Sequence, residues 1–422
     1  PKKIQMKNIY IIVVALMVAM GAKAQHGEYV GGDVSLLPAY EEHNEAYLDG
    51  EGQPIEDMIV WLTKECGWNT FRVRLFVKPT NANHDGVIQD LEYVKALGKR
   101  VKDAGARFAL DIHYSDTWAD PVSQTPPASW SAYSTVDAKA EKVYEYTKET
   151  LEALNAYGAT PDLVQVGNEI TSGIVGVWRS TDQAGFKKIV ERGCDAVREV
   201  CPAAKVVLHV ERPQNTNAVV GFFQDIDETK YDVIGLSYYP FWHSTLAALG
   251  TTIKRLGEVF PGKKVQIVET AYNFQYEFSK PTTESACIWG RTADGQYGFV
   301  KALIAELGKY ENCNGLLYWF PEEAGCGDDT DWDHQSYGNV ITSWINRGLW
   351  WPSSNGGHWP VKAEEGMVHY LLKTFLSDEA SAVSAPSAIG GSDAIYNLAG
   401  QRITKMRAHD IYIRGGKKLI SE

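Results

Sequence analysis

Several patterns that would place this 422-residue chain in a common functional class are missing from it. Only six residues are cysteines and none has a C-x-x-C spacing, so the sequence gives no support for a structural zinc site. The net charge is −12 and no basic stripe runs through the body of the chain, which argues against nucleic acid as a partner. No G-x-G-x-x-G follows the first apolar run, so an open, dinucleotide-binding sheet is not favoured.

An apolar run near the N-terminus has the pattern of a secretory signal. Residues 9–20 are apolar, three lysines precede them, and Ala22-Lys23-Ala24 follows as a small-x-small cleavage site. A run of about a dozen residues is too short to cross a bilayer, so a signal is favoured over a membrane anchor. We therefore expect residues 1–24 to be a signal peptide, no stable membrane span, and export to the periplasm, the cell surface or the medium.

The rest of the chain alternates regularly between apolar runs and amphipathic stretches. Eight short runs are apolar throughout, at residues 29–36, 70–77, 107–115, 163–170, 205–212, 233–240, 264–272 and 314–321. The amphipathic stretches lie at residues 54–66, 90–104, 136–157, 182–200, 216–226, 244–260, 295–311 and 361–377. Strands that are apolar on both faces indicate a parallel sheet covered by helices. Eight such units predict an α/β fold, a (β/α)₈ TIM barrel over residues 25–378.

The composition changes after this predicted barrel. Residues 379–393 are rich in Ala, Ser, Gly and Pro, which predicts a linker. Residues 394–422 hold two alternating patterns, typical of a small C-terminal β appendage that is too short to be stable alone. This tail resembles the C-terminal sorting segments of exported Bacteroidetes proteins. The alternative is a β module without a transport role.

Polar and ionisable side chains gather at the C-terminal ends of the predicted strands, where a TIM barrel holds its active site. Glu169 ends the fourth strand and Glu269 ends the seventh. A buried parallel strand has no ordinary use for a carboxylate at this position, whereas a retaining glycosidase needs two of them about 5–5.5 Å apart. The other strand ends present Arg72, Arg74, Asp111, His113, Asn168, His209, Glu211, Tyr238, Tyr239 and Trp319.

Structural roles compete with these functional interpretations. The two glutamates could belong to an ion-paired barrel rim, for instance with Glu269 paired to Arg74, but that leaves the amide and imidazole groups nearby unexplained. A salt bridge inside the barrel is as plausible for the two arginines as a direct function. Core packing stays open for His113, His209 and Trp319.

The most distinctive segment follows the third strand and reads His113-Tyr114-Ser115-Asp116-Thr117-Trp118-Ala119-Asp120-Pro121. Together with Gly167-Asn168-Glu169 and Glu269-Thr270-Ala271-Tyr272, it resembles the arabinogalactan endo-β-1,4-galactanases of glycoside hydrolase family 53, over residues 29–377. The resemblance implies endo cleavage of β-1,4-galactan, the side chains of pectin, with retention of anomeric configuration. It also implies that galactan and galactooligosaccharides are the partners and that catalysis requires no cofactor.

The resemblance further implies a role for each candidate site residue. Glu169 would be the acid/base, Glu269 the nucleophile, and Asn168 the group that bonds the sugar 2-hydroxyl. One of Arg72 and Arg74, and one of Tyr238 and Tyr239, would orient the nucleophile. The remaining residues expected to support or line the sugar site are Asp111, His113, Trp118, Asp120, His209, Trp242 and Trp319.

Family members stabilise the loops after strands 7 and 8 with either calcium or a disulfide. Cys287 and Cys326 lie one in each predicted loop, so the resemblance predicts that they pair, which an exported compartment permits. The other four cysteines are expected to be buried thiols. The strand-8 loop also offers hard oxygen ligands for a structural calcium ion, and a solvated acidic loop is the alternative. These ligands would come from Asp328, Asp329, Asp331 and Asp333.

Two other functions remain open at this stage. Another retaining barrel glycanase, such as a mannanase, xylanase or cellulase, would use the same pair of carboxylates, and only the segment after the third strand argues for galactan. A non-catalytic glycan-binding barrel would be expected to lack one carboxylate, and both are present. Nothing in the sequence indicates an oligomer, so we expect a monomer.

Overall fold

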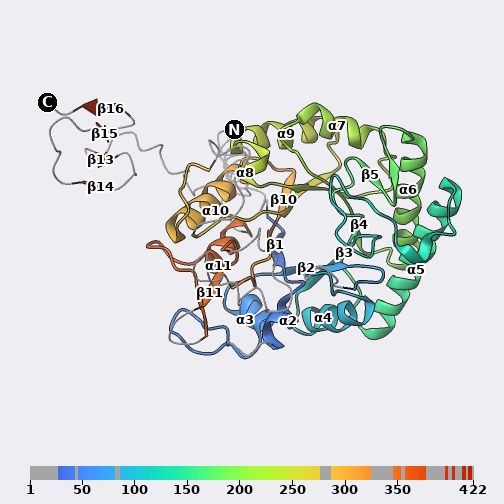
Figure 1. Ribbon diagram of the computed structural model, residues 1–422, viewed down its shortest axis with the longest axis horizontal. Coiled ribbons are helices and arrows are strands. Elements are labelled where there is room, and N and C mark those ends of the chain that lie inside the picture. The colour runs from blue at the N-terminus through green and yellow to red at the C-terminus, as the bar shows by residue number, and fades with distance from the viewer. Residues whose placement is uncertain are drawn as a thin grey trace, which may run out of the picture.

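The computed structural model describes residues 27–42, 46–80, 86–275, 287–324, 346–352 and 357–376, together with four short strands beyond residue 394. Eight parallel strands close into a barrel in the order β1-β2-β3-β4-β7-β8-β9-β10, with helices on its outside (Figure 1). The predicted TIM barrel is therefore confirmed. Its strands are β1 (Tyr29–Asp33), β2 (Thr70–Leu75), β3 (Arg107–Ile112), β4 (Leu163–Val166), β7 (Lys205–Val210), β8 (Val233–Ser237), β9 (Lys264–Glu269) and β10 (Cys313–Trp319).

The strands are buried on both faces, as their apolar composition predicts. In β2, for example, Phe71, Val73 and Leu75 join the large apolar cluster that includes helix residues. The alternate residues Arg72 and Arg74 therefore point into the barrel. A small apolar layer inside the barrel lies below these polar residues and comprises Tyr29, Ala109, Leu163, Val207, Val233 and Val268.

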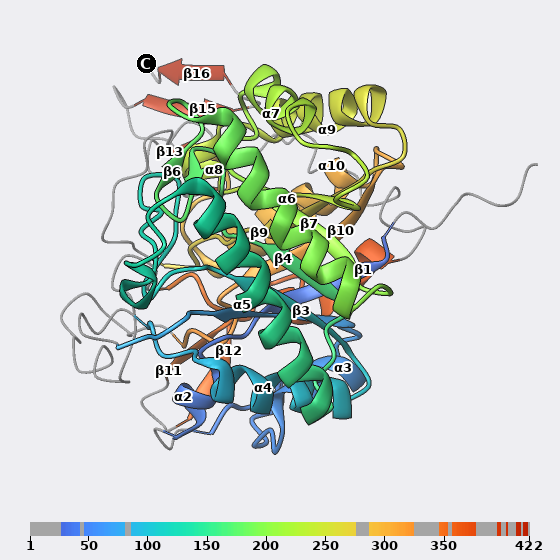
Figure 2. The ribbon, with the colours of Figure 1, turned by 90° about the vertical axis from the view of Figure 1, so that its right-hand side faces the viewer.

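Helices cover the outside of the barrel, and α5 and α6 pack against each other across one side (Figures 1 and 2). Each of the long helices begins after an Asp, Asn or Thr whose side chain accepts a backbone N–H of the first turn, a cap that stabilises a helix by about 1 kcal/mol. The helices are α3 (Met58–Lys64), α4 (Leu91–Asp103), α5 (Val136–Tyr157), α6 (Gln183–Val200), α7 (Thr216–Gln224), α9 (Leu246–Val259), α10 (Ala293–Leu307) and α11 (Val368–Leu371).

The predicted helix over residues 361–377 is wrong for its first half. Residues 363–366 form a tight turn in which Ala363 and Gly366 exchange backbone hydrogen bonds, and Gly366 has a φ of 140°. That φ is incompatible with a helix, so α11 starts only at Val368 and passes into a short 3-10 helix, Leu372–Leu376.

Short elements inside the connecting loops were not predicted, because they are too brief to show a periodic pattern. They include the hairpin β5–β6 directly after β4 and the short helix α8 directly after β8. The full set is α2 (Leu37–Glu42), a 3-10 turn (Ala128–Trp130), β5 (Gly173–Ile174), β6 (Val177–Trp178), α8 (Pro240–His243), β11 (Trp350–Pro352) and β12 (His358–Pro360).

Beyond the barrel, a four-stranded antiparallel sheet has the order β14-β13-β15-β16. The two alternating patterns of the tail form β13 (Ile395–Asn397) and β15 (Ile411–Arg414), joined by β14 (Arg402–Ile403) and β16 (Lys417–Ile420). The predicted signal peptide and linker lie outside the described residues and stay predictions. None of the helices in the described part of the chain combines the length and apolar character needed to cross a bilayer.

A buried carboxyl group links the loop after β10 to the end of β1. Glu322 is 1% exposed, and its Oε1 accepts the backbone N–H of Leu36 at 2.8 Å. Burial, and then the negative charge of Asp33, raise the pKa of Glu322 to about 8. Because this folded-state pKa lies above that of an unfolded glutamate, the protonated group stabilises the fold at low pH, and the stabilisation is lost as the pH rises toward 8.

We therefore expect Glu322→Gln, which keeps the acceptor oxygen but cannot ionise, to reduce the loss of stability between pH 5 and pH 8. The wild-type loss attributable to this group is at most on the order of 4 kcal/mol. Chemical unfolding of both proteins across this pH range measures the difference. Parallel stability curves for the two proteins would contradict the assignment.

Candidate active site

The two glutamates at the ends of β4 and β9 converge. The chain turns sharply after β4, where Gly167 has a φ of 82° and Glu169 a φ of 44°. A Cβ on Gly167 would lie 2.5 Å from Ile170 Cγ2, so this turn requires glycine. As a result, a carboxylate oxygen of Glu169, one of Glu269 and a ring nitrogen of His209 all lie within 4.8 Å of one another.

An ion pair and a hydrogen bond stabilise the ionised form of Glu269. Arg72 Nη2 lies 2.9 Å from Glu269 Oε1, and the Tyr239 hydroxyl donates to Oε2 at 3.0 Å. Burial, and then the charge of Glu269, raise the pKa of Tyr239 well above its usual range, so the phenol keeps its proton and stays a donor. Burial raises the pKa of Glu269 to about 7, although Arg72 and Tyr239 lower it.

The surroundings of Glu169 stabilise its ionised form less than those of Glu269 do. Burial, and then the charge of Glu269, raise the pKa of Glu169 well above its usual range, and Glu211 and Asp120 add to this effect. Among the described residues, one neutral group donates a hydrogen bond to its side chain, the Ser237 hydroxyl, at 2.6 Å. The first proton to leave the pair therefore comes from Glu269, and Glu169 keeps its proton.

A chain of hydrogen bonds continues from Glu169 into the barrel wall. Ser237 Oγ lies 2.8 Å from His209 Nε2, and His209 Nδ1 lies 3.0 Å from Asn168 Oδ1. Burial, and then the charge of Arg72, lower the pKa of His209 well below its usual range, so the ring is neutral. The Ser237 hydroxyl can donate to an ionised Glu169 or accept from a protonated one, so this contact suits both protonation states of Glu169 without moving a heavy atom.

Arg72 is the centre of the charged network below the two glutamates. Its Nη1 lies 2.7 Å from Asp33 Oδ2, and its Nη2 lies 2.8 Å from Asp111 Oδ2 and donates to Asn168 Oδ1 at 2.9 Å. The side chain is 1% exposed, so its charge must be neutralised inside the barrel. Burial opposes ionisation of Asp111, yet Arg72 and then His113 hold the pKa of Asp111 at about 2.

Arg74, the second arginine of β2, contacts other groups than Arg72 does. Arg74 Nη1 lies 3.1 Å from Asp33 Oδ1, and among the described residues its ion pair is with Asp33 and not with Glu269. Its guanidinium carbon lies 4.9 Å from the Trp118 ring centroid and 5.3 Å from that of Trp319. Arg74 thus fixes the two tryptophans by cation–π contacts, and the structure gives the contact with the nucleophile candidate to Arg72.

His113 and Asn168 hold the distinctive segment after β3. His113 Nδ1 accepts the backbone N–H of Ala119 at 3.1 Å, and Asn168 Nδ2 donates to the carbonyl of Ala119 at 2.8 Å. Asp120 Oδ1 accepts two backbone N–H groups of its own loop, from Val122 at 2.7 Å and Ser123 at 2.8 Å. Asp120 therefore shapes this turn, and the segment is fixed beside the glutamates.

The pair of tyrosines after β8 separates in the structure. The Tyr238 hydroxyl donates to the Ser244 carbonyl at 3.0 Å, and its ring stacks on Phe299, away from Glu269. The resemblance allowed either tyrosine to contact Glu269, and in the structure Tyr239 makes this contact. Trp242 lies in α8, half-buried, with its ring edge-on to Tyr239 at 5.4 Å between centroids.

Three contributors to the site were not on the predicted list: Asp33, Gln165 and Ser237. Asp33 and Gln165 are buried partners of Arg72, and Ser237 is the partner of Glu169. The alternation of inward-facing and outward-facing residues along a strand could have identified Asp33 and Gln165, because both side chains face into the barrel.

The predicted disulfide and the predicted calcium site stay predictions. Cys326 and all four aspartates of the calcium prediction lie outside the described residues.

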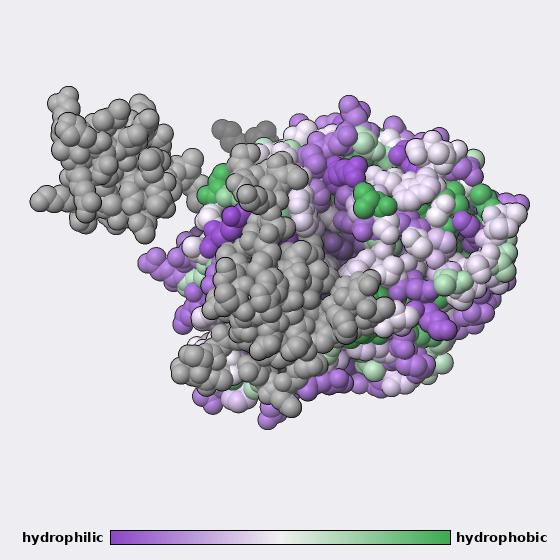
Figure 3. Space-filling model, viewed as in Figure 1, coloured by the Kyte–Doolittle hydropathy of each residue, from purple (hydrophilic) through white to green (hydrophobic). Residues whose placement is uncertain are grey.

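A closed barrel with two converging carboxylates at the ends of β4 and β9 defines a barrel glycoside hydrolase. In the view along the barrel, the surface is hollowed near its middle, with hydrophilic residues beside the hollow (Figure 3). The chain belongs to glycosyl hydrolase family 53, whose family model matches residues 29–348.

Two relatives of similar sequence support this membership. The chain is 32% identical to the endo-beta-1,4-galactanase of Bacillus subtilis over 336 residues, which is 77% of this chain and 76% of that protein. It is 32% identical to a probable arabinogalactan endo-beta-1,4-galactanase A of Aspergillus terreus, over 71% of this chain and 88% of that protein.

Solved structures agree with this fold. The GH53 catalytic domain of Ignisphaera aggregans has a TM-score of 0.69 and 26% identity, over 78% of this chain and 93% of that domain. A fungal beta-1,4-galactanase has a TM-score of 0.66 and 25% identity, over 79% of this chain and 97% of that chain.

Replacing Arg72 by Met should destabilise the fold by about 3–5 kcal/mol, because three buried carboxylates would lose their shared cation. Urea unfolding measures the change. The control is Arg107→Met, at a side chain 38% exposed that lies 3.9 Å from the Glu28 carboxylate and donates to the exposed Glu28 carbonyl at 3.0 Å, where a loss of about 1 kcal/mol or less is expected. Equal losses for the two variants would contradict the central place of Arg72.

Proposed function

We propose that this protein is an endo-β-1,4-galactanase that cleaves the galactan side chains of pectin with retention of anomeric configuration. The observation that carries the proposal is the Glu169–Glu269 pair, with carboxylate oxygens within 4.8 Å. Such a separation favours direct attack by one carboxylate over the wider spacing that leaves room for a water between them. Family membership and the activity named for the two relatives support galactan as the substrate.

In the first half-reaction, Glu269 attacks the anomeric carbon of the bound galactosyl unit. Arg72 and Tyr239 aim its carboxylate, since each contacts a different oxygen, at 2.9 and 3.0 Å. Glu169 donates its proton to the glycosidic oxygen, so the leaving part of the polymer departs as a neutral alcohol. A galactosyl ester on Glu269 remains.

The second half-reaction reverses the role of Glu169. Once Glu269 is esterified, its negative charge is gone, and so is a main cause of the raised pKa of Glu169. Glu169 is now an anion and accepts a proton from a water that attacks the anomeric carbon. The bond from this carbon to the Glu269 oxygen breaks, which releases the sugar and restores the Glu269 carboxylate. The Ser237 hydroxyl donates to the Glu169 carboxylate in this state, as it does in the structure.

We also propose that the protein is exported, on the strength of the signal-like residues 1–24. Pectic galactan is a large polymer that lies outside the cell that degrades it. An enzyme that cleaves it must therefore be secreted by that cell or act at the cell surface.

Each step of the proposed reaction is carried out by side chains of this protein.

A panel of pectic galactan, type II arabinogalactan, mannan, xylan and cellulose, with products sized, tests the substrate. Rapid release of intermediate-length oligosaccharides from pectic galactan alone is expected. Preferential cleavage of mannan, xylan or cellulose would favour another barrel glycanase, and binding without cleavage would favour a glycan-binding barrel. An NMR time course in which the first-formed reducing ends are α would contradict retention.

Glu269→Ala should remove nearly all hydrolysis of every substrate, because no nucleophile remains. Glu169→Ala should lower activity on galactan by about 10²–10⁴-fold but affect aryl galactosides with good leaving groups far less, since these need no protonation. Steady-state kinetics on both substrates measure the contrast. Equal losses on the two substrates would mean that Glu169 is not the acid.

Ser237→Ala should move the alkaline limb of the pH–rate profile to higher pH. The Ser237 hydrogen bond lowers the pKa of Glu169, so its loss makes the acid hold its proton longer. The dependence of kcat/KM on pH measures the shift, with Ser237→Thr as the control that keeps the hydroxyl. A shift to lower pH, or none, would contradict the proposed contact.

A further inference from the structure

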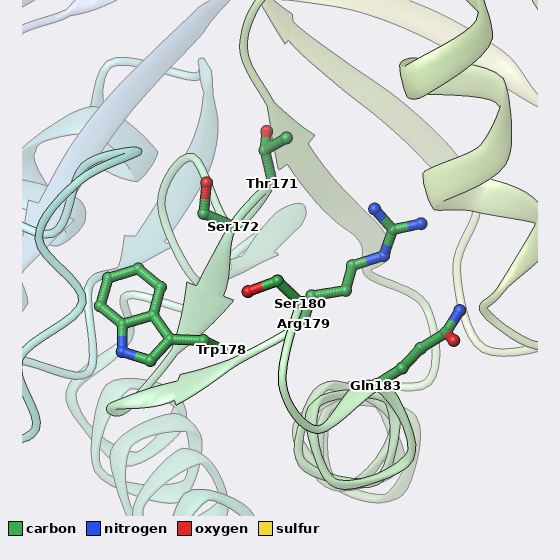
Figure 4. A pocket seen from close by; sticks show the side chains of 6 residues that line it. All are labelled: Thr171, Ser172, Trp178, Arg179, Ser180 and Gln183. Carbon is green, nitrogen blue, oxygen red and sulfur yellow. The ribbon is translucent and has the colours of Figure 1, made fainter.

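A cavity of about 370 Å³ lies beside the hairpin that follows Glu169, and its lining includes none of the residues described above for the catalytic pair. Its size falls within the range of small-molecule sites. The cavity is lined by Thr171, Ser172, Trp178, Arg179, Ser180 and Gln183 (Figure 4). Most of these side chains carry hydroxyl, amide or guanidinium groups, and one is a large aromatic ring.

The walls of this cavity are fixed by the surrounding structure. In the β5–β6 hairpin, Gly173 pairs with Trp178, and the backbone N–H of Arg179 donates to the Ser172 carbonyl at 2.9 Å. The side chain of Arg179 pairs with Asp225 at the end of α7, with its Nε 3.1 Å from Oδ2. The cavity is therefore preformed, which lowers the entropic cost of binding.

Trp178 presents its indole to solvent. It is 36% exposed, whereas Trp68, Trp130 and Trp350 are at most 5% exposed. A Cβ on Gly173 would lie 3.0 Å from Trp178 Cε3, so the missing side chain at Gly173 lets the indole lie close against the hairpin. An exposed ring held by a rigid hairpin offers a flat apolar surface beside hydroxyl groups, the combination that suits a sugar ring.

The cavity lies on the acid's side of the catalytic pair. Thr171 is two residues beyond Glu169, which limits the distance between their Cα atoms to about 7 Å. Its hydroxyl donates to the Glu211 carboxylate, and the charge of Glu211 acts on Glu169. Because the acid protonates the glycosidic oxygen of the leaving group, the leaving part of the polymer must extend from this side.

We propose that this cavity is a subsite for galactosyl units in the leaving part of the polymer, with Trp178 as its stacking surface. The inference rests on the proposed function. The axial 4-hydroxyl of galactose leaves C–H groups together on the opposite ring face, which packs on the indole. The hydroxyls of Ser172 and Ser180 and the amide of Gln183 supply polar partners for the sugar hydroxyls.

The test compares kcat/KM on long pectic galactan with kcat/KM on an aryl β-galactobioside, whose small aryl group does not extend beyond the leaving-group position next to the scissile bond. Trp178→Ala should lower the galactan value about tenfold, the effect of losing roughly 1.4 kcal/mol of binding. The loss on the aryl substrate should be several times smaller. Ser180→Lys, which fills the cavity from an exposed position, should show the same selectivity.

The matched control is Tyr157→Ala. Tyr157 is 44% exposed and is the last residue of α5, at the end of the barrel opposite the strand C-termini. It should alter neither substrate. The subsite would be overturned if Trp178→Ala and Ser180→Lys lowered kcat/KM on galactan no more than Tyr157→Ala does. It would also be overturned if these two variants lowered kcat/KM equally on both substrates. In either case the proposed function would stand. Wild-type protein inactive on galactan would overturn both.

Discussion

The buried guanidinium of Arg72 is the interaction on which the rest of this site depends. Within 2.9 Å it meets Asp33, Asp111 and Glu269, one from each of three strands, and it also donates to Asn168. A charge at 1% exposure costs free energy unless such partners surround it, so Arg72 in turn requires these strands to close around it. Barrel closure and the placement of Glu269 are therefore consequences of the same contacts.

The two glutamates differ in their surroundings more than in their burial. Glu269 has a cation and a phenol at hydrogen-bond distance, while Glu169 has a serine hydroxyl and a second carboxylate nearby. The same residue type thus becomes an anion in one position and an acid in the other. The Ser237 hydroxyl, which can donate or accept, then suits either protonation state of Glu169, and the proposed double displacement requires both states of this one group.

Much of the fold was predictable, because each barrel strand is apolar throughout and each long helix has both an amphipathic pattern and a capping residue. The predicted strand ends ran too far. For β4, the prediction extended to residue 170, but the chain leaves the sheet after Val166 because Gly167 and Glu169 adopt positive φ. The β5–β6 hairpin was also missed, since two residues per strand carry no periodic signal.

The sequence by itself determined the barrel, the strand end on which each glutamate lies and the family, because hydrophobic period and residue order are local properties of the chain. Only the tertiary structure decided which arginine of β2 and which tyrosine after β8 contact Glu269. Arg72 rather than Arg74 reaches Glu269, and Tyr239 rather than Tyr238 does so, although each pair is nearly identical in sequence context. Strand tilt and the turn after each strand set those directions, and both depend on contacts between distant parts of the chain.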